Sequence, residues 1–343
     1  MGEKELFGFT EEEAKRIVEE LKRYTHGVVE KVITKTVEKP PPPLHSLTTL
    51  QREANKLYGY SAKKTLDIAQ NLYERLKLIS YPRTESKHLS PADRKLVLKV
   101  LEKLGRRDLK EAALRAGKRV FDASKVGDHH AIIPLEKAPA GLNKDERRIY
   151  ELVLRRFLAA FYPPYIYKTT TLLIRVGKDY HFLAKFKEVL QKGWKELYDA
   201  EGENGKIPTF KEGERVKKIS QKAVKKKTQP PPRYTEGALL KEMERLGLGT
   251  PATRAQIIET LKKRGYLTRK GKTLLPTQKA FELIEKVKTL SVSSPEMTAE
   301  WEKELEKIHL GRLGYKGYRT FMERIKNFTA EGVERLKGDR KGG

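Results

Sequence analysis

The chain has 343 residues, of which 38% are hydrophobic and 35% charged, a length that allows two or three domains with a sizeable buried core. It contains no cysteine, which excludes disulfides and cysteine-based zinc sites, and its seven histidines lack the spacing of a metal-ligand motif. No apolar run approaches the ~20 residues of a membrane span, and the first residues lack the apolar core of a secretory signal. We therefore expect a cytoplasmic protein with no membrane partner and no metal site.

Positive charge dominates the sequence. Lysine and arginine number 73 against 46 aspartates and glutamates, which gives a formal net charge of +27. Such an excess favours a polyanionic partner, most commonly nucleic acid. The alternative is a surface adapted to heat, as in a thermophile, where ion-pair networks gain value. Heat adaptation alone needs both signs in balance, so the one-sided excess predicts nucleic-acid binding.

The chain opens with a predicted helix and a predicted strand. Residues 10–25 have the acidic first turn and the N-cap, Thr10, that are typical of a helix. Residues 27–37 are β-branched and alternate roughly in polarity, which predicts a strand. A run of prolines from Pro40 ends this strand and marks a boundary.

A helical block follows this boundary. Apolar positions at helical spacing predict two helices within residues 47–77, the second capped by Ser61. The segment 78–81 predicts a short strand or turn, which Pro82 ends. Helical patterns then recur at 90–117 and 143–161.

Strand patterns return after Pro163. Residues 165–176 and 180–186 predict a hairpin around Gly177, and residues 214–227 predict a further strand. These strand segments and the earlier one flank the helical block. The order predicts a helical domain inserted into a β domain, with all the strands in one sheet.

The last part of the chain predicts helix, helix and hairpin. One helix runs from Thr235 to Arg245, a second covers residues 250–264, and residues 266–275 form a hairpin with basic residues at its tip. This is a winged-helix pattern. It echoes the first helix pair, because a shift of 189 positions (250 − 61) aligns apolar and capping residues of the two segments without a gap. We therefore predict two related helix-turn-helix units, although the matches are mostly core leucines and chance remains the alternative.

The segment Leu78-Ile-Ser-Tyr-Pro-Arg-Thr-Glu-Ser86 combines groups suited to phosphoryl transfer. Arg83 follows Tyr81 by two residues, so in an extended chain both side chains point to the same side. An arginine can grip a phosphate and stabilise charge that develops on it. A tyrosine oxygen can form a covalent phosphoester. The alternative is a tyrosine packed under a loop with a surface arginine, and spacing alone favours that reading.

Four motifs, in the same order along the chain, closely resemble those of type IA DNA topoisomerases, in particular the topoisomerase III branch and archaeal relatives. The first is the tyrosine region, Leu47–Asn55 and Ala62–Glu74 together with Ile79–Ser86. The others are Asp128–Pro134, then Arg233–Met243 with Gly249–Ile258, and finally Met297–Glu302. The motifs span nearly the whole chain, which makes the resemblance specific.

The resemblance implies roles for individual residues. Tyr81 would be the nucleophile that becomes a 5′-phosphotyrosine, Arg83 would hold the scissile phosphate, and His129 would contact a DNA phosphate beside them. Thr253 and Arg254 open a helix whose N-terminus suits backbone phosphates, although a capped, solvated helix start is the alternative. The full set of predicted nucleic-acid contacts, in which ordinary solvated faces are the alternative for the lysines, is Gln51, Arg52, Lys63, Lys64, Thr84, Ser86, His130, Arg233, Thr253 and Arg254.

The sequence departs from the family pattern in one respect. Members usually begin with a toprim domain whose Glu and Asp-x-Asp-type cluster binds Mg²⁺, and neither feature is found here. We therefore expect that this chain binds no cofactor itself and that Mg²⁺ is needed only together with a toprim domain. Alone, it should bind single-stranded DNA without relaxing supercoils, and a toprim-bearing subunit should restore cleavage. A split subunit, a fragment and a degenerate DNA-binding relative all fit this pattern.

We expect a mainly α fold with a β arch, a fragment of the type IA topoisomerase ring with winged-helix-like units. The arch would comprise residues 1–45 and 162–230, the catalytic-tyrosine domain 46–161, and a DNA-gripping winged-helix-like domain 231–343. The partner would be DNA, preferably single-stranded. The main rival is a non-catalytic winged-helix protein that only binds single-stranded DNA. That rival explains the charge but not the four ordered motifs.

Overall fold

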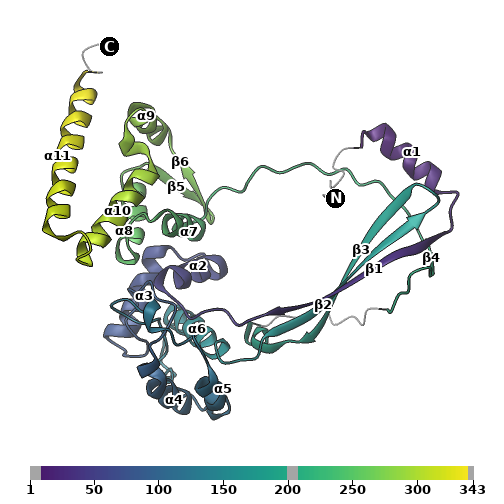
Figure 1. Cartoon of the computed structure of the whole chain (residues 1–343), viewed down its shortest axis with the longest axis horizontal. Helices are drawn as coiled ribbons and strands as arrows, with labels where there is room; N and C mark the ends of the chain where they lie inside the picture. Colours follow the sequence, from purple (N-terminus) through teal and green to yellow (C-terminus); the bar gives the residue numbers. More distant parts are fainter. Residues whose placement is uncertain (1–8, 199–207, 339–343) are drawn as a thin grey trace. The chain divides into compact units, whose positions relative to one another are not determined.

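The computed structural model describes residues 9–198 and 208–338, which divide into two compact units. Unit 1 combines the chain up to Pro42 with Leu158–Pro231, and unit 2 combines Pro43–Phe157 with the chain from Pro232 onward. Unit 1 contains the long strands and unit 2 most of the helices (Figure 1). Within the described ranges, no helix has both the length and the apolar character needed to cross a membrane.

Unit 1 is built on one antiparallel sheet of order β3-β2-β1-β4. The strand that precedes the helical block pairs with the strand that follows it, from Val28 opposite Arg175 to Lys39 opposite Tyr165. This confirms that the two strand segments share a sheet. Gly177, at φ +70°, makes the turn between β2 and β3, as the hairpin prediction requires. The elements of unit 1 are α1 (Glu11–Leu21), β1 (His26–Lys39), β2 (Tyr165–Val176), β3 (Tyr180–Gln191), η4 (Gly193–Tyr198) and β4 (Arg215–Lys217).

Two predictions in unit 1 are partly wrong. Thr10 caps α1 as expected, but the helix ends at Leu21 and not near residue 25. The strand expected over 214–227 shrinks to β4, whose three residues pair with His26–Val28. Beyond it, Ile219 and Val224 are largely exposed, so ordering this lysine-rich stretch would bury too little apolar surface to offset the lost conformational entropy.

The first part of unit 2 is the predicted helical block. Ser46 and Ser61 cap the first two helices, each accepting a hydrogen bond from the backbone N–H three residues on. The helix expected over 90–117 is interrupted, because Gly105 adopts φ +72°. The elements are α2 (Leu47–Tyr58), α3 (Ala62–Glu74), η1 (Pro91–Asp93), α4 (Arg94–Lys103), η2 (Arg107–Leu109), α5 (Lys110–Arg115), η3 (Ala123–Lys125) and α6 (Lys144–Ala159).

The core of this block joins α2, α3 and α6 to the segments that carry the motifs. Leu50 of α2, Leu72 of α3 and Leu152 of α6 are buried in one cluster. Ile79 and Ile132, which lie in two different motifs, belong to the same cluster. Packing in the core therefore brings these motifs together.

The second part of unit 2 is helix, helix and hairpin followed by three more helices. Thr235 and Thr250 lie at the N-caps of α7 and α8, as the sequence predicts. The hairpin β5-β6 turns at Gly271, also as predicted. The elements are α7 (Glu236–Leu246), α8 (Pro251–Lys263), β5 (Leu267–Lys270), β6 (Thr273–Pro276), α9 (Gln278–Val287), η5 (Ser291–Ser293), α10 (Pro295–His309) and α11 (Gly314–Gly338).

The two helix pairs of unit 2 pack with α2 against α7 and α3 against α8. A Cβ atom at Gly237 would stand 3.1 Å from the Asn55 Oδ1 atom, which accepts a hydrogen bond from the Gly237 N–H, so a larger residue would crowd this contact between α7 and α2. The buried Glu236 carboxylate accepts a hydrogen bond from the Ala62 N–H at the start of α3 (2.8 Å) and pairs with Lys262 of α8 (3.1 Å). Corresponding helices thus meet one another, an arrangement consistent with the internal sequence echo.

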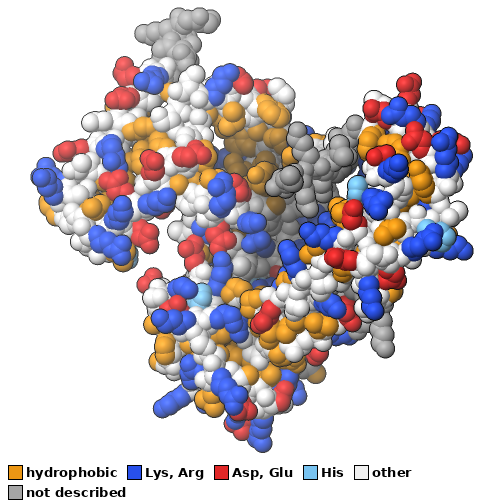
Figure 2. All heavy atoms as spheres, turned by 45° about the vertical axis from the view of Figure 1, so that its right-hand side comes forward, with side chains coloured by type: hydrophobic (Ala, Val, Ile, Leu, Met, Phe, Trp, Pro, Cys, Tyr) orange, Lys and Arg blue, Asp and Glu red, His pale blue; other side chains and the backbone are white. Residues whose placement is uncertain are grey.

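Basic side chains are spread over the visible face of the molecule in both units, with acidic side chains among them (Figure 2). The net positive charge is therefore not one uniform field.

Candidate active site around Tyr81

Tyr81 lies just after α3, on an irregular segment that pairs with the second motif. The Ser80 N–H donates to the Ile133 carbonyl (2.9 Å), and the Ser80 hydroxyl accepts from the Ile133 N–H (2.9 Å) and donates to the Ala131 carbonyl (3.2 Å). These bonds carry the Asp128–Pro134 run alongside Tyr81. The motifs that the sequence separates by about fifty residues thus form one site.

The Tyr81 ring is half-buried between two other rings. Tyr73 of α3 meets it edge-on with centroids 5.4 Å apart, and His129 lies at 4.3 Å with a tilt of 48°. No described residue forms a hydrogen bond with the Tyr81 hydroxyl. The tyrosine borders a cavity of about 250 Å³, whose lining residues are Tyr81, Ser90, Asp93, Val126, Asp128, His129 and His130.

Arg83 does not share the side of the chain occupied by Tyr81, which corrects the expectation from an extended backbone. The Thr84 N–H donates to the Pro82 carbonyl (3.0 Å), so the backbone makes a three-residue turn at Arg83. The exposed Arg83 guanidinium donates to the Gln70 side chain (3.2 Å). It lines a second cavity of about 580 Å³ between α3 and α8, whereas Tyr81 lines the first.

Thr84 and Ser86 hold the loop in place. Both are buried, and the Thr84 hydroxyl donates to the His129 carbonyl (2.9 Å) while its own carbonyl accepts from the Leu47 N–H (3.0 Å). The Ser86 hydroxyl lies within hydrogen-bond distance of the Lys125 carbonyl (2.9 Å). In this conformation both hydroxyls form hydrogen bonds within the protein, so nucleic-acid contact at these positions stays a prediction.

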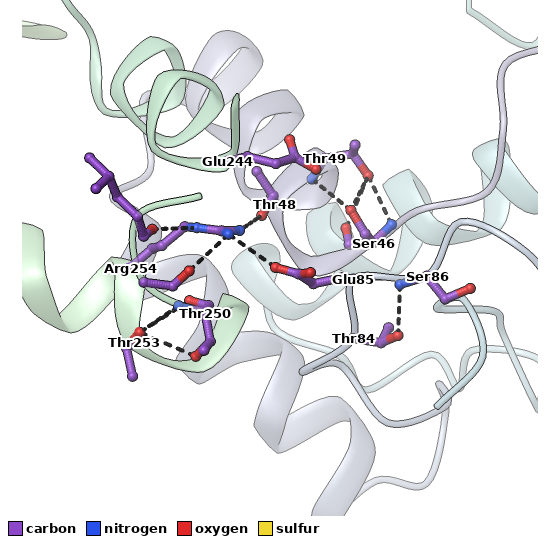
Figure 3. A network of polar contacts seen from close by, with 12 residues as sticks. Ser46, Thr48, Thr49, Thr84, Glu85, Ser86, Glu244, Thr250, Thr253 and Arg254 are labelled. Atoms are coloured by element: carbon purple, nitrogen blue, oxygen red, sulfur yellow. Dashed lines mark hydrogen bonds and ion pairs between the residues drawn. The ribbon is translucent and has the colours of Figure 1, made fainter. Parts of the chain in front are cut away.

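Arg254 is likewise engaged within the protein (Figure 3). Only 4% of its side chain is exposed, although it was predicted to contact DNA. Its guanidinium donates to the Leu248 and Gly249 carbonyls (both 3.0 Å) and to the Thr48 hydroxyl (3.3 Å), and it pairs with Glu85 (3.0 Å). Arg254 therefore ties the N-terminus of α8 to α2 and to the loop that follows Tyr81.

Two further predicted contacts belong to helix packing and capping. Gln51 is buried, and its side-chain amide donates to the Ala62 carbonyl at the start of α3 (3.0 Å). Thr253 is exposed, and its hydroxyl accepts from the Thr250 N–H (2.8 Å) within a capping box. Thr253 thus keeps the open position that the prediction needs, and Gln51 does not.

The remaining predicted contacts lie nearer the surface of unit 2. Lys63 pairs with Asp67 within α3 (2.5 Å) and lines the same cavity as Arg83, while Lys64 pairs with Asp145 (2.6 Å). Thr253 also lines this cavity, so three predicted site residues, from α3, from α8 and from the loop after Tyr81, border the same space. Of the others, Arg52 and His130 are half-buried and Arg233 is exposed, with a His130 ring nitrogen 2.7 Å from the Ala131 carbonyl.

Several residues at the site carry no distinguishing pattern in the sequence. Tyr73 has the spacing of an apolar helix position, and only the structure shows its ring against Tyr81. Asp93 forms a capping box with Ser90, and in the sequence this pattern indicates the start of a helix but gives no sign that Asp93 lines a cavity. The contact between Gln70 and Arg83 could be predicted only if the turn at Arg83 were already known. Asp128 is the exception, because it opens the second motif.

A buried histidine supports the segment that carries His129. His45 is fully buried, its carbonyl accepts from the Ile132 N–H (2.8 Å), and one ring nitrogen lies 3.0 Å from the Thr49 hydroxyl. The other ring nitrogen is 3.4 Å from Glu53, which already pairs with Arg156. Burial, with the positive charge of Arg156 as the second cause, holds the pKa of His45 well below its ordinary value.

This pKa shift predicts acid sensitivity of unit 2. His45 stays neutral in the folded protein, whereas the unfolded chain binds a proton there below about pH 6.5. The contribution of His45 to stability is therefore complete above about pH 6.5 and is lost as the pH falls, at up to ~1.4 kcal/mol per pH unit. We expect the free energy of unfolding to fall more steeply between about pH 7 and pH 5 in the native protein than in His45→Gln. Identical pH profiles of melting would contradict the prediction.

A protein-family comparison places residues 3–320 in a family described as DNA topoisomerase. DNA topoisomerase 1 of Pyrococcus horikoshii is 41% identical over 321 residues, which is 88% of this chain and 45% of that protein. DNA topoisomerase 3 of Bacillus licheniformis is 35% identical over 344 residues, which is 89% of this chain and 46% of that protein. The chain thus spans about half the length of the curated relatives it matches.

A solved structure is also similar. Full-length topoisomerase I from Thermotoga maritima superposes with a TM-score of 0.77 at 32% sequence identity, over 95% of this chain and 56% of that one. The similarity of fold therefore extends over both units and is not confined to the tyrosine region.

Proposed function

The chain belongs to the type IA DNA topoisomerase family, and we propose that it carries the DNA-cleaving tyrosine of such an enzyme at Tyr81. The observation that carries this proposal is the setting of the Tyr81 side chain. Its ring is held between Tyr73 and His129 at the edge of a cavity, and no described residue forms a hydrogen bond with its hydroxyl. The packing thus positions a nucleophile without consuming its reactive oxygen.

The proposed reaction is a reversible transesterification. The Tyr81 oxygen attacks a backbone phosphorus, a bond from phosphorus to the Tyr81 oxygen forms, and the bond from phosphorus to the 3′ oxygen breaks. Tyr81 loses its proton, and the departing 3′ oxygen gains one. Attack of that 3′ hydroxyl on the 5′-phosphotyrosine restores the strand. Because one phosphoester replaces another, the break can be resealed without an external energy source.

Arg83 and His129 would hold the phosphate for this reaction. His129 lies against the Tyr81 ring, and Arg83 is the exposed cation two residues along the chain. In this conformation Arg83 lines a different cavity from Tyr81, so it would reach the same phosphate only after its guanidinium leaves Gln70 and turns toward the tyrosine. The bond from Arg83 to Gln70 involves an exposed side chain, so a phosphate can displace it at little cost.

Mg²⁺ and the proton donor are expected to come from a toprim-type domain. Among the described residues, no three His, Asp or Glu side chains come close enough together to hold a metal ion. Acidic groups on a toprim domain would supply the metal site and the proton for the 3′ oxygen. We propose that this chain works with such a domain, on another chain or in another part of the protein.

The helical parts of unit 2 would grip the strand. We propose that residues 46–161 and 231–343 are separate domains, and that α7, α8 and the hairpin β5-β6 form a winged-helix-like unit. Two features support this: the order helix, helix, hairpin, and the exposed Thr253 side chain in the first turn of α8, where the positive end of the helix dipole suits a phosphate. Single strands are the expected substrate.

A covalent trapping experiment tests the proposal. The chain is incubated with a labelled single-stranded oligonucleotide and Mg²⁺, with and without a toprim-bearing chain, and then denatured. We expect an adduct only when the toprim chain is present, with the nucleotide attached to the peptide that contains Tyr81. Attachment to a different residue would refute the assignment. Tight binding without any adduct under all conditions would favour the non-catalytic DNA-binding reading.

A further inference from the structure

His130 is the histidine of the second motif to which the proposed reaction gives no role. Its ring is half-buried, and one ring nitrogen, Nδ1, lies 2.7 Å from the Ala131 carbonyl. A carbonyl oxygen can only accept a hydrogen bond, so Nδ1 carries the proton and donates it. In the neutral imidazole this leaves Nε2 without a proton, as the basic nitrogen of the ring. The contact with Ala131 therefore holds His130 in the tautomer that a general base at Nε2 requires.

His130 and Tyr81 line the same cavity. That cavity measures about 250 Å³, and its polar lining gives it room and partners for water. A general base can take a proton directly or through one water, and the direct contact often forms only when substrate is bound. Because no described residue forms a hydrogen bond with the Tyr81 hydroxyl, a water in this space can link that hydroxyl to His130.

Two carboxylates on the wall of this cavity favour a positive charge on His130. Asp93 accepts a hydrogen bond from the Ser90 N–H (2.8 Å), and Asp128 is exposed two residues before His130. In the part of the chain that the structure describes, neither carboxylate lies within ion-pair distance of a basic side chain. Their negative charge is therefore available to stabilise the imidazolium that forms when His130 accepts a proton.

We propose that His130 accepts the proton of Tyr81 during DNA cleavage, an inference that rests on the proposed function. As the Tyr81 oxygen bonds to phosphorus and the bond from phosphorus to the 3′ oxygen breaks, the phenol proton passes through water to Nε2, and His130 becomes an imidazolium. On resealing, the 3′ hydroxyl attacks, and His130 returns the proton to the departing Tyr81 oxygen. The proton that the 3′ oxygen gains during cleavage comes separately, from the acidic groups proposed for the toprim-type domain.

The neighbouring His129 is less suited to this task. Its ring lies against the Tyr81 ring with centroids 4.3 Å apart, and among the described residues no hydrogen bond selects its tautomer. His129 is also exposed, which suits the phosphate contact proposed for it. The two adjacent histidines thus divide the work, with His129 on the phosphate and His130 on the proton.

His130→Asn tests the role while keeping the local structure. The asparagine amide can donate to the Ala131 carbonyl as Nδ1 does, but it has no basic nitrogen. His88→Asn is the matched control, because His88 is also half-buried and does not line the cavity. Each full chain is mixed with a toprim-bearing chain, Mg²⁺ and a labelled single-stranded oligonucleotide, and the rate of adduct formation at Tyr81 is measured across pH. Affinity for the oligonucleotide is measured separately by fluorescence anisotropy.

We expect His130→Asn to slow adduct formation by about a hundredfold or more, with oligonucleotide affinity changed by less than about twofold. The rate of the native chain should rise with pH across about pH 6–7, where histidines ordinarily titrate, and the variant should lose this rise. His88→Asn should keep the pH profile and a rate within about twofold of the native one. A native rate and pH profile in His130→Asn, a loss of affinity that accounts for the slower reaction, or an equal effect in His88→Asn would each overturn the proposal.

Chemical rescue separates a base from a residue that only supports the fold. His130→Ala removes the ring, and added imidazole should raise its rate of adduct formation by about tenfold or more, because a free base can then take the proton. A rate that imidazole does not raise would count against the proposal. The proposed function fails in a different way: no Tyr81 adduct in the native chain under any condition would overturn both proposals, whereas a native adduct with an unaffected His130→Asn would overturn this inference alone.

Discussion

Replacing Tyr81 with phenylalanine is expected to abolish covalent attachment to DNA. The substitution keeps the ring that packs between Tyr73 and His129 and removes only the hydroxyl, which bonds to no described residue. The fold should therefore persist while the nucleophile is lost. Because loss of a covalent nucleophile is typically severe, we expect adduct formation to fall at least about a thousandfold, below detection by gel. The measurement is trapping on a single-stranded oligonucleotide with a toprim-bearing chain present.

Tyr58→Phe is the matched control for this experiment. Tyr58 is also a half-buried tyrosine of unit 2, and it does not line the cavity beside Tyr81. Loss of the Tyr58 hydroxyl should leave the adduct yield within about twofold of that of the unsubstituted chain, as is usual for a change away from the reacting atoms. An adduct that persists in Tyr81→Phe would refute the residue assignment, and equal loss in both variants would show that the effect is not specific to Tyr81.

Replacing Arg254 is expected to destabilise unit 2. Arg254→Met keeps the aliphatic stem but leaves the Leu248 and Gly249 carbonyls and the Thr48 hydroxyl without this donor. We expect the free energy of unfolding to fall by about 2–4 kcal/mol, because buried polar groups lose a charged partner. Thermal or denaturant unfolding of the full chain measures the loss.

Two companion substitutions separate a structural role of Arg254 from a role in DNA binding. Glu85→Gln removes only the exposed end of the network and should cost less than about 1 kcal/mol. Arg254→Lys keeps the charge but cannot supply the same set of donors, so it should destabilise as well. If Arg254→Lys keeps full stability and Arg254→Met loses only DNA affinity, the arginine acts on phosphate and the structural account fails.

Local patterns accounted for most of the secondary structure. The caps at Thr10, Ser61 and Thr235 satisfy free N–H groups within one turn of the chain, so neighbouring residues alone predict them. The turn at Gly177 likewise depends on one residue that tolerates positive φ. In the lysine-rich stretch after β4, a local strand pattern predicted a strand that did not form, because the segment buries too little apolar surface.

The candidate site also has features that the sequence predicts and features that only the fold reveals. The sequence alone determined the helical block with its caps, the shared sheet and the motif around Tyr81, because these rest on short-range spacing and on resemblance. Only the tertiary structure decided which motif residues are open to a ligand. Thr84 and Arg254 carry polar groups typical of DNA contacts, yet the His129 carbonyl binds the Thr84 hydroxyl, and the Thr48 hydroxyl and Glu85 bind the Arg254 guanidinium. The direction of Arg83 also depends on a turn closed by one backbone hydrogen bond, which alternation along an extended chain does not reveal. Burial arises from contacts between residues far apart in sequence, and for that reason spacing could place Tyr81 in a motif but could not place its neighbours around it.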